Sequence, residues 1–203
     1  LTKRTVLSSI GYEYEITNSL DRRGIDVALM YLPFTFKRIE SQSLRYSARQ
    51  TTRDVLRVSG VLMTGDTLDV YDVHLPTKLN GRERDRLKME IVRMMKNNVD
   101  SIISLRTNPQ ILVMGDFNDN PKSDLMNKEL GASLLETDEQ THYNKLFNLT
   151  SSCRNGTYKY QGHWDTIDQI ISNGTLLNKG NRIVFNPTHT RIVNNTFLLE
   201  DDR

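Results

Sequence analysis

The stretch from about residue 80 to residue 118 constrains the fold more than any other part of the sequence. Asn80, followed by Glu83 three residues later, is typical of a capped helix start. Apolar residues then recur at helical spacing until Asn108-Pro109; they are Leu87, Ile91, Met94, Met95, Ile102 and Ile103. Residues 111–114 follow as an apolar run of strand length. An amphipathic helix that leads into a buried strand packs on a sheet, so an α/β layered fold is predicted.

Shorter segments elsewhere have the composition of strands. Strands are predicted at residues 12–17, 25–32, 34–41, 53–63 and 68–73, with Thr64-Gly65-Asp66 as a turn, so the middle of the chain resembles an antiparallel meander. Later strands are predicted at 156–160, 166–172 and 182–185, with short helices at the start of the chain and at 123–130. No repeat, low-complexity tract or Pro/Gly-rich linker interrupts the sequence, so residues 1–203 are interpreted as a single domain.

Composition excludes some classes of protein. Hydrophobic residues make up 37% of the 203 residues and charged residues 26%, which is ordinary for a globular domain and argues against disorder. The formal net charge of +2 is too small to indicate a nucleic-acid partner by itself. The single cysteine, Cys153, excludes an internal disulfide framework and a multi-cysteine zinc site. No apolar run approaches the roughly 18 residues that are needed to span a bilayer.

Three apolar strand segments end abruptly in polar residues. Their sequences are VYDVHLP at 70–76, MGDFND at 114–119 and WDTIDQII at 164–171. Open α/β folds bind ligands at strand ends along one rim of the sheet. These three segments therefore predict a functional site.

Asp116 and Asn118 are two residues apart, so a continuing strand would point both side chains to the same side. A carboxylate can align or deprotonate an attacking water, and a carboxamide can orient that water or contact a hard cation. The alternative is that this Gly-Asp-x-Asn segment only ends a strand in a turn, because all three residue types favour turns.

The other polar residues of these segments have alternative interpretations too. His74 could stabilise or protonate a phosphoryl oxygen, or have a structural role. Asp168 stands among isoleucines, so a partly buried carboxylate with a partner is expected there, with a cap or turn bond as the alternative. Trp164, the only tryptophan, is expected in the core when it is considered alone.

Basic residues cluster in two places. Arg45, Arg49 and Arg53 approach a strand, and their guanidinium groups suit phosphate oxygens, although ion pairs with Asp54 and its neighbours are the alternative. The basic residues at 82, 84, 86 and 88 are interleaved with acidic residues, so this part of the helix, Lys88 included, is predicted to be a solvated face.

The order of these motifs resembles the endonuclease/exonuclease/phosphatase superfamily of DNase I-like, metal-dependent phosphoesterases. The chain runs from strand-His-Leu-Pro through an amphipathic helix to Gly-Asp-Phe-Asn and then Trp-x-x-Ile-Asp-x-Ile-Ile-Ser. The resemblance covers about residues 24–172, and residues 23–28 are similar to the family strand that leads into the site. It implies an α/β sandwich of two packed sheets flanked by helices. It also implies hydrolysis of phosphoester bonds with Mg²⁺ or Mn²⁺, by in-line attack of water.

The resemblance implies a role for each motif residue. Asp116 corresponds to the residue that positions or deprotonates the attacking water, and Asn118 to its orienting neighbour; both are also candidate metal ligands. His74 corresponds to a polar residue at the site rim, and Asp168 to the carboxylate that orients the family's catalytic histidine. The candidate substrate-binding residues are Arg23, Arg53 and Trp164.

The chain also departs from the family pattern. The family's principal metal-binding glutamate and its Ser-Asp-His segment are not found between Leu1 and Arg203. The chain is therefore interpreted as a copy of the domain that is incomplete at both ends, with weak or no activity of its own. Nucleic acid is slightly favoured over inositol phosphate or phospholipid as the substrate, and the competing hypothesis is an inactive binding module that keeps the fold. No protein partner is predicted, and the frequency of exported bacterial members favours an extracytoplasmic location.

Overall fold

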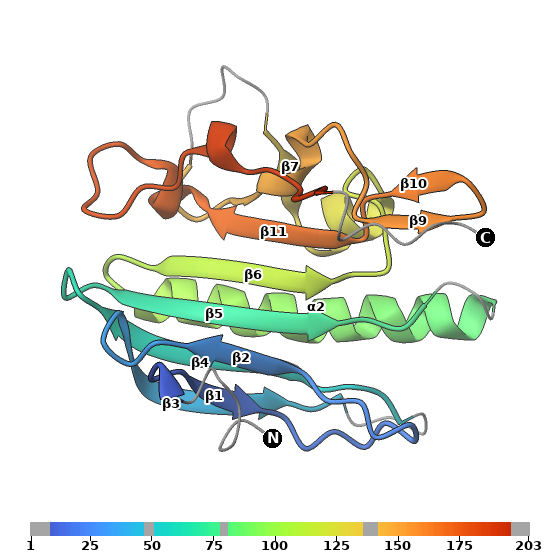
Figure 1. Cartoon of the computed structure of the whole chain (residues 1–203), viewed down its shortest axis with the longest axis horizontal. Helices are drawn as coiled ribbons and strands as arrows, with labels where there is room; N and C mark the ends of the chain where they lie inside the picture. The colour runs from blue at the N-terminus through green and yellow to red at the C-terminus, as the bar shows by residue number, and fades with distance from the viewer. Residues whose placement is uncertain (1–8, 47–50, 78–80, 136–141, 196–203) are drawn as a thin grey trace.

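A seven-stranded mixed sheet forms the centre of the computed structural model, which describes residues 9–46, 51–77, 81–135 and 142–195. The strand order is β3-β4-β5-β6-β11-β8-β7. The bounds are β3 (Phe36–Leu44), β4 (Val55–Leu62), β5 (Thr67–His74), β6 (Gln110–Asp116), β7 (Ala132–Leu134), β8 (Leu146–Asn148) and β11 (Asp168–Asn173). Figure 1 shows helix α2 (Arg82–Leu105) lying along one face of this sheet, behind β5 and β6.

The middle of the chain forms the predicted antiparallel meander. β3 pairs with β4 and β4 with β5, both antiparallel, and Gly65 provides the left-handed turn between β4 and β5 with φ 86°. β5 and β6 are parallel, because α2 carries the chain back across the sheet between them. The parallel register places His74 opposite Asp116 at the carboxyl ends of the two strands.

Helix α2 supplies the larger of two cores. All six apolar positions predicted from its spacing lie in this core or pack against it. On the sheet side, Val73, Ile111 and Val113 are buried beneath the helix. Burial of an aliphatic side chain of this size contributes about 1.5–3 kcal/mol, so this face fixes the helix on the sheet. The predicted capping box is wrong: Gly81 is the N-cap and provides no side-chain cap, while Asn80 lies outside the described residues.

The opposite face of the sheet is covered by a small second sheet. It consists of β1 (Glu13–Ile16) paired antiparallel with β2 (Ala28–Tyr31). Leu29 and Tyr31 of β2 are buried in a second core with Val58 and Val70 of the large sheet. The fold is therefore layered, with α2 on one face of the large sheet and a packed second sheet on the other (Figure 1).

The later part of the chain differs from the predictions. Residues 123–130 contain only the short π-helical turn η2 (Leu125–Glu129), and residues 182–185 form no strand. Strands β7 and β8 were not predicted, nor was β10 (His163–Asp165), which forms a hairpin with β9 (Tyr158–Tyr160). Short 3₁₀ helices η3 (Leu149–Ser152), η4 (Gly174–Leu177) and η5 (Pro187–His189) complete the chain. The predicted amino-terminal helix falls mostly on residues 1–8, outside the described part.

Among the described residues, no helix is both long enough and apolar enough to cross a membrane.

Candidate active site

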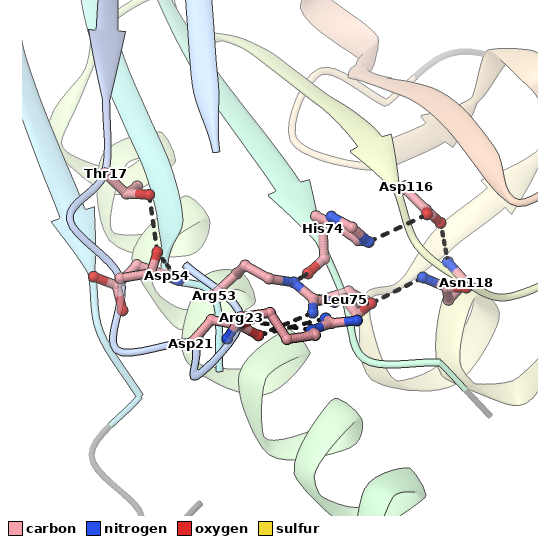
Figure 2. Close-up of polar contacts among 10 residues, drawn as sticks. Thr17, Asp21, Arg23, Arg53, Asp54, His74, Leu75, Asp116 and Asn118 are labelled. Carbon is pink, nitrogen blue, oxygen red and sulfur yellow. Dashed lines mark hydrogen bonds and ion pairs between the residues drawn. The ribbon is translucent and has the colours of Figure 1, made fainter. Parts of the chain in front are cut away.

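Three of the predicted catalytic residues meet at one rim of the large sheet. Asp116 ends β6, and its register partners are His74 at the end of β5 and Asp168 at the start of β11. The imidazole of His74 faces the carboxylate of Asp116, with Nε2 at 3.5 Å from Oδ2 (Figure 2). The site therefore arises because two parallel strands end, and one antiparallel strand begins, at the same edge.

Asn118 is oriented by its loop and not by a continuing strand. Its backbone N–H donates to Asp116 Oδ1 at 2.7 Å, and its side-chain Nδ2 donates to the Leu75 carbonyl at 2.9 Å. The residue is left-handed, with φ 48°, a conformation that asparagine tolerates better than most residues. Since the amide nitrogen is engaged, the carboxamide oxygen is the atom left to meet a water or a cation.

Burial and neighbouring charges shift the pKa values of Asp116 and His74. Burial raises the pKa of Asp116, and the charge of Asp168 raises it further, although the Asn118 amide lowers it. Burial lowers the pKa of His74, and so does the positive charge of Arg53. Both directions favour a neutral imidazole beside a carboxylate that accepts protons more readily than an exposed aspartate.

Lys88 is buried beneath this loop, so the prediction of a solvated face is wrong at this position. Its side chain is 2% exposed, and Nζ donates to the Asn118 carbonyl at 2.8 Å and lies 3.4 Å from Asp119 Oδ2. Gln169 donates from Nε2 to the Asp119 carbonyl at 2.6 Å. The signal was present in the sequence: Lys88 precedes Val92 by four positions, on the apolar face of the helix.

Arg53 lies in the interior and binds the backbone at the end of β5. Its Nε donates to the His74 carbonyl at 2.9 Å and its Nη2 to the Leu75 carbonyl at 2.8 Å (Figure 2). Its Nη1 is 3.2 Å from Asp21 Oδ2, and both side chains of this ion pair are less than a tenth exposed. We therefore interpret Arg53 as a support for the strand that carries His74, in place of the substrate contact expected from the sequence.

The other candidate arginines differ in whether they are free to contact a phosphate or are held in an ion pair. Arg23 lies beside the same Asp21 carboxylate, at 3.3 Å, but is 61% exposed, so it stays a candidate for contact with a phosphate (Figure 2). Arg45 forms a bidentate ion pair with Asp54. This agrees with the alternative prediction that the arginine cluster forms ion pairs and does not bind phosphate. Arg49 lies outside the described residues.

Asp168 and Trp164 are both more exposed than the sequence suggested. Asp168 is exposed at the rim, where its backbone N–H donates to Thr157 Oγ1 at 3.0 Å, so the expected buried carboxylate is not found. Trp164 is 48% exposed on β10, and the expectation that it lies in the core is wrong. Its role in substrate binding stays a prediction.

A cavity of about 390 Å³ lies beside the rim, on the sheet face that carries Asp72 and Asp168. Residues 190–193 also line it, among them Arg191. Burial raises the pKa of Asp72 to about 6.

The main chain of Gly115, with φ 129°, passes so close to β5 that a Cβ atom would lie 2.1 Å from the Val73 carbonyl oxygen.

The described residues contain no cluster of three or more His, Cys, Asp or Glu side chains that could hold a metal ion. They do offer two hard oxygen ligands at the rim, the carboxylate of Asp116 and the carboxamide oxygen of Asn118. Mg²⁺ commonly retains several waters and takes only one or two protein carboxylates. The two residues therefore fit part of a divalent-cation site, but they do not form a complete one.

Comparison with known proteins gives a family and a fold. The sequence matches the Endonuclease/Exonuclease/phosphatase family over residues 1–203. Solved structures that share the fold include the human Nocturnin catalytic domain with bound sulfate anion, at 18% identity and TM-score 0.58, covering 85% of this chain and 64% of that chain. ANGEL2, a 2',3'-cyclic phosphatase, has 14% identity and TM-score 0.62, covering 82% and 63%. Truncated Caenorhabditis elegans TDP2 has 13% identity and TM-score 0.59, covering 83% and 63%.

These comparisons have clear bounds. No curated protein matches the chain. The chain spans less than two thirds of the length of each solved structure named above, and at these identities the likeness shows the fold alone. The family match covers every motif from which the resemblance was inferred, and it confirms that inference together with the α/β fold. The chain belongs to the endonuclease/exonuclease/phosphatase family, whose members hydrolyse phosphoester bonds.

Proposed function

We propose that this protein hydrolyses phosphoester bonds by the attack of a water held between Asp116 and Asn118, with a divalent cation as cofactor. One observation supports this most strongly: His74, Asp116 and Asn118 converge at a single sheet rim in a chain of this family. A protein that only retained the fold would have no need of a histidine facing a carboxylate there.

Each residue has a distinct task in this proposal. Asp116 accepts the proton of the attacking water, and the Asn118 carboxamide oxygen orients that water toward phosphorus. The His74 imidazole, on the other side of the carboxylate, is placed to donate to a phosphoryl oxygen. Asp168 adds negative charge next to Asp116 at the rim. These roles require the side chains to be held rigidly, and Lys88 and Arg53 supply bonds to the backbone that do so.

The cofactor that fits these oxygen ligands is Mg²⁺ or Mn²⁺, held by Asp116 and Asn118 with further ligands from water or substrate. When bound, such a cation neutralises negative charge on the phosphoryl oxygens. The exposed guanidinium of Arg23 is a second source of positive charge for the substrate.

Nucleic acid is the substrate class that we favour, with inositol phosphate or phospholipid as the alternative. ANGEL2 is described as a 2',3'-cyclic phosphatase, and a sulfate anion, which has the shape of a phosphate group, is bound in the Nocturnin structure. Support for nucleic acid comes from the structure of ANGEL2 in complex with adenosine-2',3'-vanadate, and from the exposed aromatic residues Tyr158, Tyr160 and Trp164 on β9 and β10 at the end of the sheet that carries the rim. A single domain over residues 1–203 and an extracytoplasmic location stay predictions from the sequence.

Hydrolysis of bis(p-nitrophenyl) phosphate and of plasmid DNA by the protein in its natural full length tests the proposal. We expect turnover with Mg²⁺ or Mn²⁺ that stops in EDTA and returns when the cation is added back. Turnover that persists in EDTA would contradict the assigned cofactor. No turnover of either substrate with any cation would favour the inactive binding module over a nuclease.

A further inference from the structure

The hairpin β9–β10 exposes an unusual amount of aromatic surface. Tyr158, Tyr160 and Trp164 are each about half exposed, at 48%, 55% and 48%. The two residues of its turn, Gln161 and Gly162, both have positive φ, of 48° and 80°. Such a turn matches the twist of the flanking strands, which is why a two-residue loop can join β9 and β10. Three large aromatic side chains exposed together on one hairpin indicate a binding surface.

The two faces of the hairpin have different chemistry. Tyr158 and Tyr160 share one face, with ring centroids 6.4 Å apart and planes only 11° from parallel. Lys159 and Trp164 are register partners on the other face, and Lys159 Nζ lies 5.9 Å from the centre of the indole ring. Flat rings beside a cation suit a ligand that combines a π-system with negative charge.

The root of the hairpin is fastened to the candidate active site. Thr157 Oγ1 accepts hydrogen bonds from the backbone N–H groups of Ile167 and Asp168, both at 3.0 Å. The Ile167 carbonyl in turn accepts from the backbone N–H of Phe117, which follows Asp116 directly, at 2.9 Å. In Figure 1 the hairpin projects at the same end of the sheet as the tips of β5 and β6. Three residues of strand span about 10 Å, which is close to the length of three stacked nucleotides.

We propose that the hairpin β9–β10 is a stacking platform for unpaired nucleobases of a single-stranded nucleic acid whose scissile phosphate lies at Asp116. The proposal rests on the proposed function and narrows its substrate class to single strands or frayed ends. A base within a duplex has both faces covered by its neighbours, whereas an unpaired base can place a face on an aromatic ring. Each base stacked in this way contributes about 1–3 kcal/mol to binding.

A lipid surface is the competing partner for exposed aromatic residues, and the hairpin does not suit it. The part that would enter a bilayer first is the turn, and this turn is Gln161-Gly162. Placing an amide side chain and open backbone groups in hydrocarbon is unfavourable. The aromatic rings instead lie along the strands, where a nucleic acid strand can run past them.

The test uses Trp164, the only tryptophan of the chain, as its own reporter. A single-stranded oligothymidylate of about ten nucleotides is titrated into the protein in EDTA, so that binding is measured without hydrolysis, and tryptophan emission is followed. We expect saturable quenching, much weaker quenching by a duplex of the same length, and a Kd that rises about 5- to 150-fold in Tyr160→Ala. Tyr143→Ala is the matched control, because Tyr143 is equally exposed, at 55%, but its carbonyl accepts from the Asn173 side chain at the opposite end of β11 from Asp168.

Three results would overturn the platform: no quenching by single strands, equal affinity for the duplex, or a loss in Tyr160→Ala no larger than in Tyr143→Ala. Emission that changes with mixed phosphatidylcholine and phosphatidylserine vesicles but not with oligonucleotides would assign the hairpin to a membrane surface instead. Quenching without hydrolysis in the phosphodiesterase assay would support the platform and overturn the proposed hydrolysis. Hydrolysis without quenching would overturn the platform alone.

Discussion

Replacing Arg53 with methionine separates structural support from substrate contact. Arg53 binds the carbonyls of His74 and Leu75 and pairs with Asp21, all in the interior. Arg23 pairs with the same Asp21 carboxylate but is mostly solvent-exposed. The two arginines therefore share one partner and differ in burial, which makes Arg23→Met a matched control.

The expected loss follows from the contacts. Each charge-assisted hydrogen bond from Arg53 to a carbonyl contributes about 1.5–3 kcal/mol net. Asp21 keeps its contact with Arg23 in this variant, so its charge is not left without a partner, and most of the expected loss comes from the two carbonyl hydrogen bonds. Methionine fills much of the same volume, so little cavity is added. We expect Arg53→Met to lower the free energy of unfolding by about 3–5 kcal/mol, and Arg23→Met by less than about 1 kcal/mol.

Urea unfolding at pH 7, followed by circular dichroism, measures both values. Arg53→Lys keeps the charge but loses the guanidinium fork, and it should fall between the two if the methionine variant does not fold. A cost for Arg53→Met as small as that for Arg23→Met would refute the argument. Arg53 would then return to the list of residues that face a substrate.

Three further changes test other parts of the structure. Gly115→Ala places a Cβ against the Val73 carbonyl in a left-handed backbone, so we expect a large loss of stability or no folded protein, measured by thermal unfolding. Lys88→Met removes the donor to the Asn118 carbonyl; hydrogen exchange of the backbone amides around Asn118 should then quicken, while the same change at an exposed lysine should not affect it. Burial raises the pKa of Asp72 from 3.8 to about 6, so between these values the unfolded chain has already released the proton that the folded protein keeps, and stability falls as the pH rises from about 4 to about 6. Asp72→Asn should therefore be more stable than the wild type at pH 8, by up to about 3 kcal/mol, and the gain should vanish near pH 4 in urea titrations.

Sequence patterns predicted an element correctly where its apolar residues recur at a regular spacing, or where an apolar run ends abruptly in polar residues. The 24 residues of α2 repeat apolar side chains at helical spacing, and β6 is an apolar run that ends at Gly115-Asp116. His74, Asp116 and Asp168 were named because polar residues follow apolar strands abruptly, and the register brings these three together. The short strands β7, β8 and β10 have three residues each, too few for any period to be visible.

Burial of single polar residues was harder to predict than the elements themselves. Lys88 was expected in solvent because charged residues surround it in the sequence, but its position on the helix turns it inward to the Asn118 carbonyl. Arg53 was expected to contact a phosphate because its backbone partners are not visible in the sequence. The carbonyls that it binds belong to His74 and Leu75, more than twenty residues away. Trp164 was expected in the core because tryptophan usually lies there, and only the hairpin geometry shows it in solvent.

The role of Asp116 in hydrolysis is tested most directly by the turnover rate of Asp116→Asn in the phosphodiesterase assay, with Asp124→Asn as the matched control. The side chain of Asp124 is 81% exposed. In the described part of the chain, it forms an ion pair with Lys128, four residues later. We expect Asp116→Asn to keep the urea midpoint of the wild type and to lose at least about 10²-fold in turnover, while Asp124→Asn retains full activity. An Asp116→Asn protein that keeps more than about a tenth of the wild-type rate would show that Asp116 does not act on the attacking water.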